Sequence, residues 1–317
     1  MKNLGMAIAV AAGALMIAAP TLALSDDLQG QGRAVVTILP AHSGEQAANV
    51  SQQDLKVKVN GKESSVINFT PLRGPDSRLE LMFLIDGSAR ASLSQQFGDI
   101  TAFVKEMPAN SRVGIAYMEN GRAAVASPLS ADAAQVLKGL HLSVGSPGSN
   151  ASPYFCLSDL AQHWPSDDRT ARREVVMITD GVDNYNRRFD PDDPYVEAAI
   201  NDSVRAGLVV YSMYWQDQGR ANSTDYQTNA GQSLLQEVAE ATGGYSYWQG
   251  TGNPVSFEPY FTDLRRRLNH QYALSFSSQL NGKPEVKTLK LDLHVASAKV
   301  EAPRRVFVTR PVGPAGE

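Results

Sequence analysis

The stretch LELMFLIDGS, residues 79–88, decides the fold. An apolar run interrupted only by Glu80 ends at Asp86, and Ser88 follows two positions later. A second run of this kind, EVVMITDG at residues 174–181, ends at Asp180. Runs without polar alternation are typical of strands buried on both faces, which occur in parallel sheets covered by helices.

Segments with helical spacing alternate with such strands. The helical segments are SLSQQFGDITAFVKEM (92–107), DPYVEAAINDSVRAG (193–207) and AGQSLLQEVAEATGG (230–244), and LVVYSMYW (208–215) is a further apolar strand. This alternation predicts an α/β domain over residues 79–270, with a doubly wound, mostly parallel sheet and helices on both faces. The carboxyl ends of parallel strands meet at one edge, where such folds bind ligands. We therefore expect Asp86 and Asp180 on the same edge.

β-rich segments flank this domain. Residues 26–72 are predicted to form a small accessory β module, in which Asn60-Gly61 lies between two strand-like runs and indicates a hairpin. Three further β-rich runs lie within 271–310, and the sequence leaves open whether they extend the main sheet or pack on the N-terminal module. Residues 311–317 (PVGPAGE) are predicted to be a disordered tail.

The N-terminus has the features of an export signal. Lys2 is followed by the apolar run LGMAIAVAAGALMIAA, Pro20 and small residues near Ala23 and Ser25, so we predict a signal peptide over residues 1–25. An uncleaved anchor is the alternative. We expect a periplasmic or secreted protein without stable membrane insertion after cleavage. A net charge of −4 argues against a nucleic-acid partner.

The order of these motifs resembles the von Willebrand factor type A (VWFA) domain, which holds a divalent cation in a metal-ion-dependent adhesion site. The resemblance covers residues 79–270 and extends to exported bacterial proteins with flanking β segments. It implies metal ligands at Asp86, Ser88, Ser152 (in ASPYFCLSDL) and Asp180 (in MITDG), and Mg²⁺ or Mn²⁺ as the cation. The family's second serine is missing, because position 90 is arginine.

Arg90 leaves two hypotheses open. If its guanidinium points inward, it replaces the ion and neutralises the aspartates; if it points to solvent, water fills the missing position. With an ion bound, an acidic side chain of a protein partner would complete the ion's shell; without one, Arg90 itself is the candidate for binding that side chain. Aspartates at strand ends also cap loops by accepting backbone N–H groups, which is the structural alternative for Asp86 and Asp180.

The sequence therefore predicts a non-enzymatic, adhesion-type protein-interaction module. The five histidines have no metal-ligand spacing, and there is no G-x-S-x-G elbow or phosphate-binding loop. The alternatives are a metal-independent structural scaffold of the cell envelope and an unrecognised hydrolase.

Overall fold

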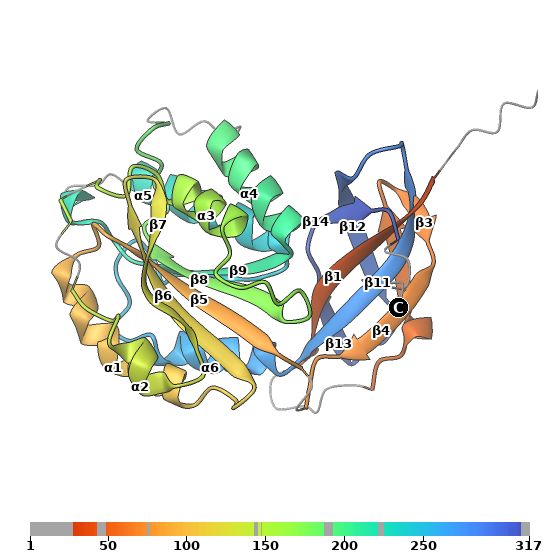
Figure 1. Ribbon diagram of the computed structural model, residues 1–317, viewed down its shortest axis with the longest axis horizontal. Helices are drawn as coiled ribbons and strands as arrows, with labels where there is room; N and C mark the ends of the chain where they lie inside the picture. The colour runs from red at the N-terminus through yellow and green to blue at the C-terminus, as the bar shows by residue number, and fades with distance from the viewer. Residues whose placement is uncertain are drawn as a thin grey trace, which may run out of the picture.

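The computed structural model describes residues 28–42, 49–74, 77–142, 145–146, 148–186, 193–220 and 225–311. Figure 1 shows two β-sheets side by side, one enclosed by α-helices and one with only a short helical turn beside it. The predicted signal peptide lies outside the described residues, as does the tail apart from Pro311. No helix in the described ranges has the length and apolar character to cross a membrane.

The elements have the following bounds. The strands are β1 (Leu28–Pro40), β2 (Leu55–Val59), β3 (Lys62–Ser64), β4 (Val66–Pro71), β5 (Leu79–Asp86), β6 (Ser111–Glu119), β7 (Arg122–Ser130), β8 (Arg172–Thr179), β9 (Leu208–Tyr214), β10 (Ser246–Tyr247), β11 (Gln271–Leu280), β12 (Glu285–Leu293), β13 (Ala298–Glu301) and β14 (Arg305–Thr309). The helices are α1 (Phe97–Lys105), α2 (Ala133–Leu137), α3 (Pro153–Gln162), α4 (Pro194–Ala206), α5 (Asp225–Thr242) and α6 (Glu258–Leu268), with short 3₁₀ segments at Gln52–Asp54, Ala91–Gln96 and Gln218–Arg220.

The α/β sheet has six strands in the order β10-β9-β8-β5-β6-β7. All neighbouring pairs are parallel except β6 and β7. Alternate residues of β5 enter two cores: Phe83 packs with α1 and α6, whereas Leu84 packs with α3, α4 and α5. Helices therefore cover both faces (Figure 1), and the α/β part of the fold prediction is confirmed.

The topological switch lies beside β5. The chain runs from β5 to β6 on one side and later returns to β8 on the other. Ile85 pairs with Ile178, so Asp86 at the end of β5 lies level with Thr179 at the end of β8. This arrangement places both predicted aspartates at the carboxyl edge of the sheet.

The antiparallel sheet is larger than predicted. It has eight strands, in the order β3-β2-β12-β14-β1-β11-β4 with β13 also on β1, and it encloses its own core. Strands β1–β4 from the N-terminal part share this sheet with β11–β14, so the C-terminal β runs lie with the N-terminal module and do not extend the α/β sheet. The Asn60-Gly61 hairpin is present, with both residues at positive φ and Val59 opposite Lys62.

Ion pairs connect the two sheets. Arg267 on α6 pairs with Glu301 on β13, Arg304 pairs with Glu240 on α5, and Arg305 on β14 pairs with Glu197 on α4. These contacts lie away from the carboxyl edge.

Candidate functional site

The carboxyl rim consists of the segments that leave the carboxyl ends of β5, β8 and β9 and the turn that precedes α3: residues 87–90, 180–186, 215–218 and 148–152. Asp86, Ser88, Ser152 and Asp180 all lie at this rim, and all four are buried. The turn after β5 passes close to β6, because a Cβ at Gly87 would lie 2.5 Å from the Met118 carbonyl oxygen. Glycine is the residue that permits this approach.

The Asp86 carboxylate accepts four hydrogen bonds. Its Oδ1 accepts from the backbone N–H of Ser88 at 2.9 Å and from the Ser88 hydroxyl at 2.7 Å. Its Oδ2 accepts from the Asn150 amide at 2.8 Å and from the Thr179 hydroxyl at 2.7 Å. A carboxylate has about four lone-pair sites, so all of them are occupied by groups of this chain.

The orientation of Asn150 is fixed by a second hydrogen bond. Its Oδ1 accepts from the Asn184 amide at 3.2 Å, which leaves its NH₂ group directed at Asp86. Asn150 is 1% exposed. A buried NH₂ group in this position supplies positive partial charge where a cation would otherwise lie, so direct coordination by Asp86 does not fit the residues.

Burial raises the pKa of Asp86, and the nearby charge of Asp217 adds to this effect. The hydrogen bonds from Thr179 and Ser88 act in the opposite direction. Asp217 follows β9 and is itself buried; it accepts from the backbone N–H groups of Gly148 at 3.2 Å and Gly219 at 2.5 Å. Asp217, and not Asp180, is the carboxylate that acts most on Asp86.

Asp180 lies at the same edge but belongs to a different set of contacts. Its Oδ1 accepts from the Val182 backbone N–H at 3.0 Å, and its charge raises the pKa of the buried Tyr154 and Tyr214. Consecutive residues of an extended chain point to opposite faces, so Thr179 reaches Asp86 while Asp180 faces away. The Thr179 hydroxyl therefore contacts Asp86, whereas Asp180 accepts from Val182.

Ser152 is the N-cap of α3 and accepts from the Tyr154 backbone N–H at 3.3 Å, followed by Pro153 at the first helical position. It also lies beside Asp183, whose pKa is raised mainly by burial and lowered in part by Ser152. Ser152 thus contacts Asp183, whereas Ser88 contacts Asp86.

Arg90 does not neutralise the aspartates. In the described part of the chain it forms no ion pair with Asp86 or Asp180; its Nε donates to the Asp217 carbonyl at 3.4 Å. The hypothesis that Arg90 replaces the ion is therefore wrong, since Asn150, Thr179 and Ser88 satisfy Asp86 instead. The terminal nitrogens of Arg90 make no hydrogen bond with any described residue, and the side chain is half-buried.

Three aromatic rings lie next to the rim. Phe155 on α3 packs against Tyr185 and Tyr195, with ring centroids 5.0 and 4.7 Å away, and the two tyrosines are 64% and 37% exposed. The aromatic runs that stand out in the sequence, YSMYW and YSYW, are mostly buried: Tyr211, Tyr214, Trp215 and Tyr247 are core residues.

Sequence reasoning missed Asn150, Thr179 and Asp217. A signal existed for two of them, because Thr179 directly precedes a predicted site aspartate and Asp217 follows an apolar strand as Asp86 does. Asn150 lies in a loop without periodicity. Within the described residues, no group of three or more histidine, cysteine, aspartate or glutamate side chains is arranged to hold a metal ion. The Mg²⁺ or Mn²⁺ implied by the resemblance stays a prediction.

No protein-family model matches the chain, and no curated protein matches it. Among solved structures, the conserved hypothetical protein BatB from Bacteroides thetaiotaomicron is 17% identical with a TM-score of 0.43, covering 60% of this chain and 97% of that one. The pilus adhesin SpaC from Lactobacillus rhamnosus GG is 9% identical with a TM-score of 0.42, covering 86% of this chain and 48% of that one. The SpRpn10 VWA domain is 13% identical with a TM-score of 0.35, covering 59% and 94%. With TM-scores below 0.5, these similarities do not decide the fold, which is assigned from the strand order and helix positions of this chain.

Proposed function

We propose that the chain is an exported, non-enzymatic protein-recognition module of the VWFA kind that works without a metal ion and binds its partner at the carboxyl rim. The saturated Asp86 carboxylate carries this proposal. Its four acceptor sites are filled by Ser88, Asn150 and Thr179, so the position that would bind a cation acts as a fixed internal brace.

The groups that can contact a partner are Arg90 and the aromatic rings. The terminal nitrogens of Arg90 form a planar fork that matches a carboxylate, which suits an acidic side chain on the partner. The exposed rings of Tyr185 and Tyr195 provide large, rigid contact area, and tyrosine and arginine are enriched at the energetic centres of protein interfaces. The proposed role of the buried aspartates is to hold the loops that present these residues.

The first test asks whether a cation acts on the protein. We expect the thermal unfolding of the wild-type chain to be the same in EDTA, MgCl₂ and MnCl₂, with no heat of binding for either ion. The matched variant is Arg90→Ser, which restores the serine of the family pattern; it should stay insensitive to metal, because Asn150 still occupies Oδ2 of Asp86. A metal-dependent stabilisation of the wild type would refute metal independence.

The second test concerns the partner. Affinity capture from the native envelope fraction should recover the same protein with and without EDTA. Tyr185→Ala combined with Tyr195→Ala should abolish capture, and Arg90→Gln should weaken it. Tyr245→Ala is the matched control, since this 42% exposed tyrosine precedes β10, the outermost strand of the same sheet, and belongs to none of the rim segments. Capture that is lost in EDTA, or that survives the double substitution, contradicts the proposal.

A further inference from the structure

Two adjacent cavities lie on the other side of the molecule, between the antiparallel sheet and the amino edge of the α/β sheet. Their volumes are about 650 and about 580 Å³, and Arg33, Arg169 and Phe307 line both. Strand β1 contributes Arg33, the loop before β8 contributes Arg169, and β14 contributes Phe307. Volumes of this size are typical of sites for small organic molecules.

Arginines dominate the second cavity. Five of them line it, and no described lining residue is acidic; they are Arg33, Arg169, Arg173, Arg205 and Arg310. A cleft lined by charge of one sign focuses the electrostatic field and attracts ions of the opposite sign. The net charge of the whole chain is −4, so this concentration of positive charge is local.

Four of the five arginines have no carboxylate partner among the described residues. Arg33 and Arg169 make no hydrogen bond or ion pair there. Arg173 donates to the carbonyl oxygens of Ser166 and Asp168, and Arg310 donates to that of Gly282. The remaining one, Arg205, lies 3.4 Å from Asp202. The charges of Glu80, Asp168 and Asp167 act on Arg173, so the positive charge that reaches the cleft without a described carboxylate partner is that of Arg33, Arg169 and Arg310.

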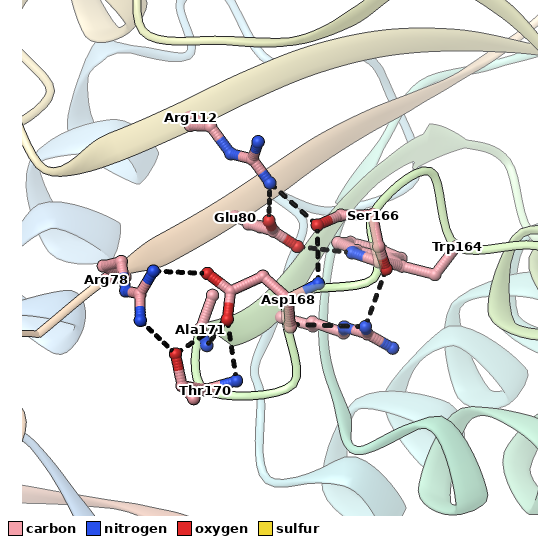
Figure 2. Close-up of polar contacts among 9 residues, drawn as sticks. Arg78, Glu80, Arg112, Trp164, Ser166, Asp168, Thr170 and Ala171 are labelled. Atoms are coloured by element: carbon pink, nitrogen blue, oxygen red, sulfur yellow. Dashed lines mark hydrogen bonds and ion pairs between the residues drawn. The ribbon is translucent and has the colours of Figure 1, made fainter.

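The loop that carries Arg169 is held firmly, as Figure 2 shows. The buried Glu80 accepts from Arg112 and from the Trp164 indole at 2.7 Å, and Arg112 also donates to the Ser166 hydroxyl at 2.8 Å. The guanidinium of Arg173 lies over the Trp164 ring, 5.6 Å from its centroid.

The acidic residue nearest to Arg169 in the sequence is already engaged. The Asp168 carboxylate pairs with Arg78 at 2.9 Å and accepts from the backbone N–H groups of Thr170 and Ala171, as Figure 2 shows. These contacts fix the turn and engage the Asp168 carboxylate with Arg78, although the charges of Asp168 and Asp167 still act on Arg173. Arg169 is thus presented by a preorganised loop, which reduces the entropy lost when it binds a ligand.

The first cavity has more apolar lining residues than the second. Val204, Leu274, Val306 and Phe307 are among its lining residues. A ligand that fills both cavities needs an anionic end for the arginines and an apolar body for this part of the cleft.

We infer that this arginine cleft binds a phosphate monoester with an apolar body. A phosphate dianion offers three oxygens to several guanidinium forks at once, whereas a single carboxylate is matched by one fork. The cleft lies at the edge of the α/β sheet opposite to the carboxyl rim, so this inference is independent of the proposed recognition function.

The test uses 1-naphthyl phosphate as the probe and titration calorimetry as the readout, on the full chain at constant ionic strength. We expect saturable binding, weaker binding of inorganic phosphate, and little binding of 1-naphthoate. Arg33→Gln and Arg169→Gln should each lower the affinity about tenfold, the loss of one strong charged contact. Both residues are exposed, and unchanged thermal unfolding of the variants shows that the fold is retained.

Arg122→Gln is the matched control, because it removes the same charge from an exposed position on β7, at the far edge of the α/β sheet. It should leave the affinity unchanged. Absence of binding to the wild type overturns the inference. If Arg122→Gln lowered the affinity for 1-naphthyl phosphate as much as the cleft variants do, the binding would depend on the overall surface charge and not on the cleft. If 1-naphthoate bound as tightly as 1-naphthyl phosphate, the ligand would not be recognised by its phosphate.

Discussion

Replacing Thr179 by valine tests the central feature of the rim. The two side chains have nearly the same shape, so the change removes the hydroxyl that donates to Asp86 Oδ2 at 2.7 Å and leaves the packing of β8 in place. The same hydroxyl also accepts from the Gly181 backbone N–H at 3.3 Å, which then loses its partner.

The magnitude follows from these two bonds. A hydrogen bond to a charged group contributes about 1.5–3 kcal/mol, and a neutral one about 1 kcal/mol. Because Asp86 is fully buried, no water replaces the lost donor. We expect the free energy of unfolding to fall by roughly 2–4 kcal/mol, which corresponds to a decrease in Tm of roughly 4–12 °C for a domain of this size.

Urea unfolding followed by circular dichroism, together with calorimetry for Tm, measures the effect. Thr37→Val on β1 is the control, since Thr37 is 2% exposed and its hydroxyl makes no hydrogen bond with a described residue. The control should change stability by less than about 0.5 kcal/mol. If Thr179→Val lowers the free energy of unfolding no more than Thr37→Val does, the Thr179 hydroxyl does not stabilise the Asp86 carboxylate. The Asp86 carboxylate would then be free to coordinate a cation.

Three further changes test other parts of the structure. Burial raises the pKa of Glu174 from its ordinary 4.5 to about 7, so the wild type should lose about 3 kcal/mol of stability as pH rises from 4.5 to 7. Glu174→Gln should remove that loss, as measured by urea titrations across this pH range. Gly244→Ala places a Cβ 1.9 Å from the Val210 carbonyl oxygen and should lower stability by about 1–3 kcal/mol, whereas Gly98→Ala, in open space on α1, should be neutral or stabilising; equal Tm values for the two would contradict the close approach. Arg267→Met leaves Asp263 and Glu301 without their buried partner and should cost about 3–5 kcal/mol, while the exposed Arg304→Met should change stability by less than about 1 kcal/mol; a urea midpoint unchanged in Arg267→Met would refute this role.

Much of the α/β domain could be predicted, because strands that are buried on both faces appear in the sequence as nearly uninterrupted apolar runs. The run at 79–86 is fully buried in the structure, and it ends at the aspartate that marks the edge of the sheet. The helix over 193–207 is likewise found at Pro194–Ala206, with Asp193 as its cap and Gly207 in the left-handed conformation at its end.

The details of the site could not be predicted, since they depend on which side chain of a loop reaches across to another strand. Nothing local distinguishes Asn150 from any other loop asparagine, and its role appears only when the turn before α3 lies against the end of β5. The sequence predicts that Asp86 and Asp180 share one edge, but it does not say which of Thr179 and Asp180 contacts Asp86. One residue of register decides which face of an extended segment a side chain occupies, and Thr179 took the inward position.

The pairing of β1 with β14 has a mechanical consequence. Gln31 at the start of β1 lies opposite Thr309 at the end of β14, so the two ends of the described chain leave the same sheet as neighbours. A tension applied across them would be borne by this short antiparallel contact together with the longer pairing of β1 with β11. The α/β domain lies between β4 and β11 in the chain, so it does not carry this tension directly. The carboxyl rim would therefore keep its shape while the strands at the ends of the chain begin to part.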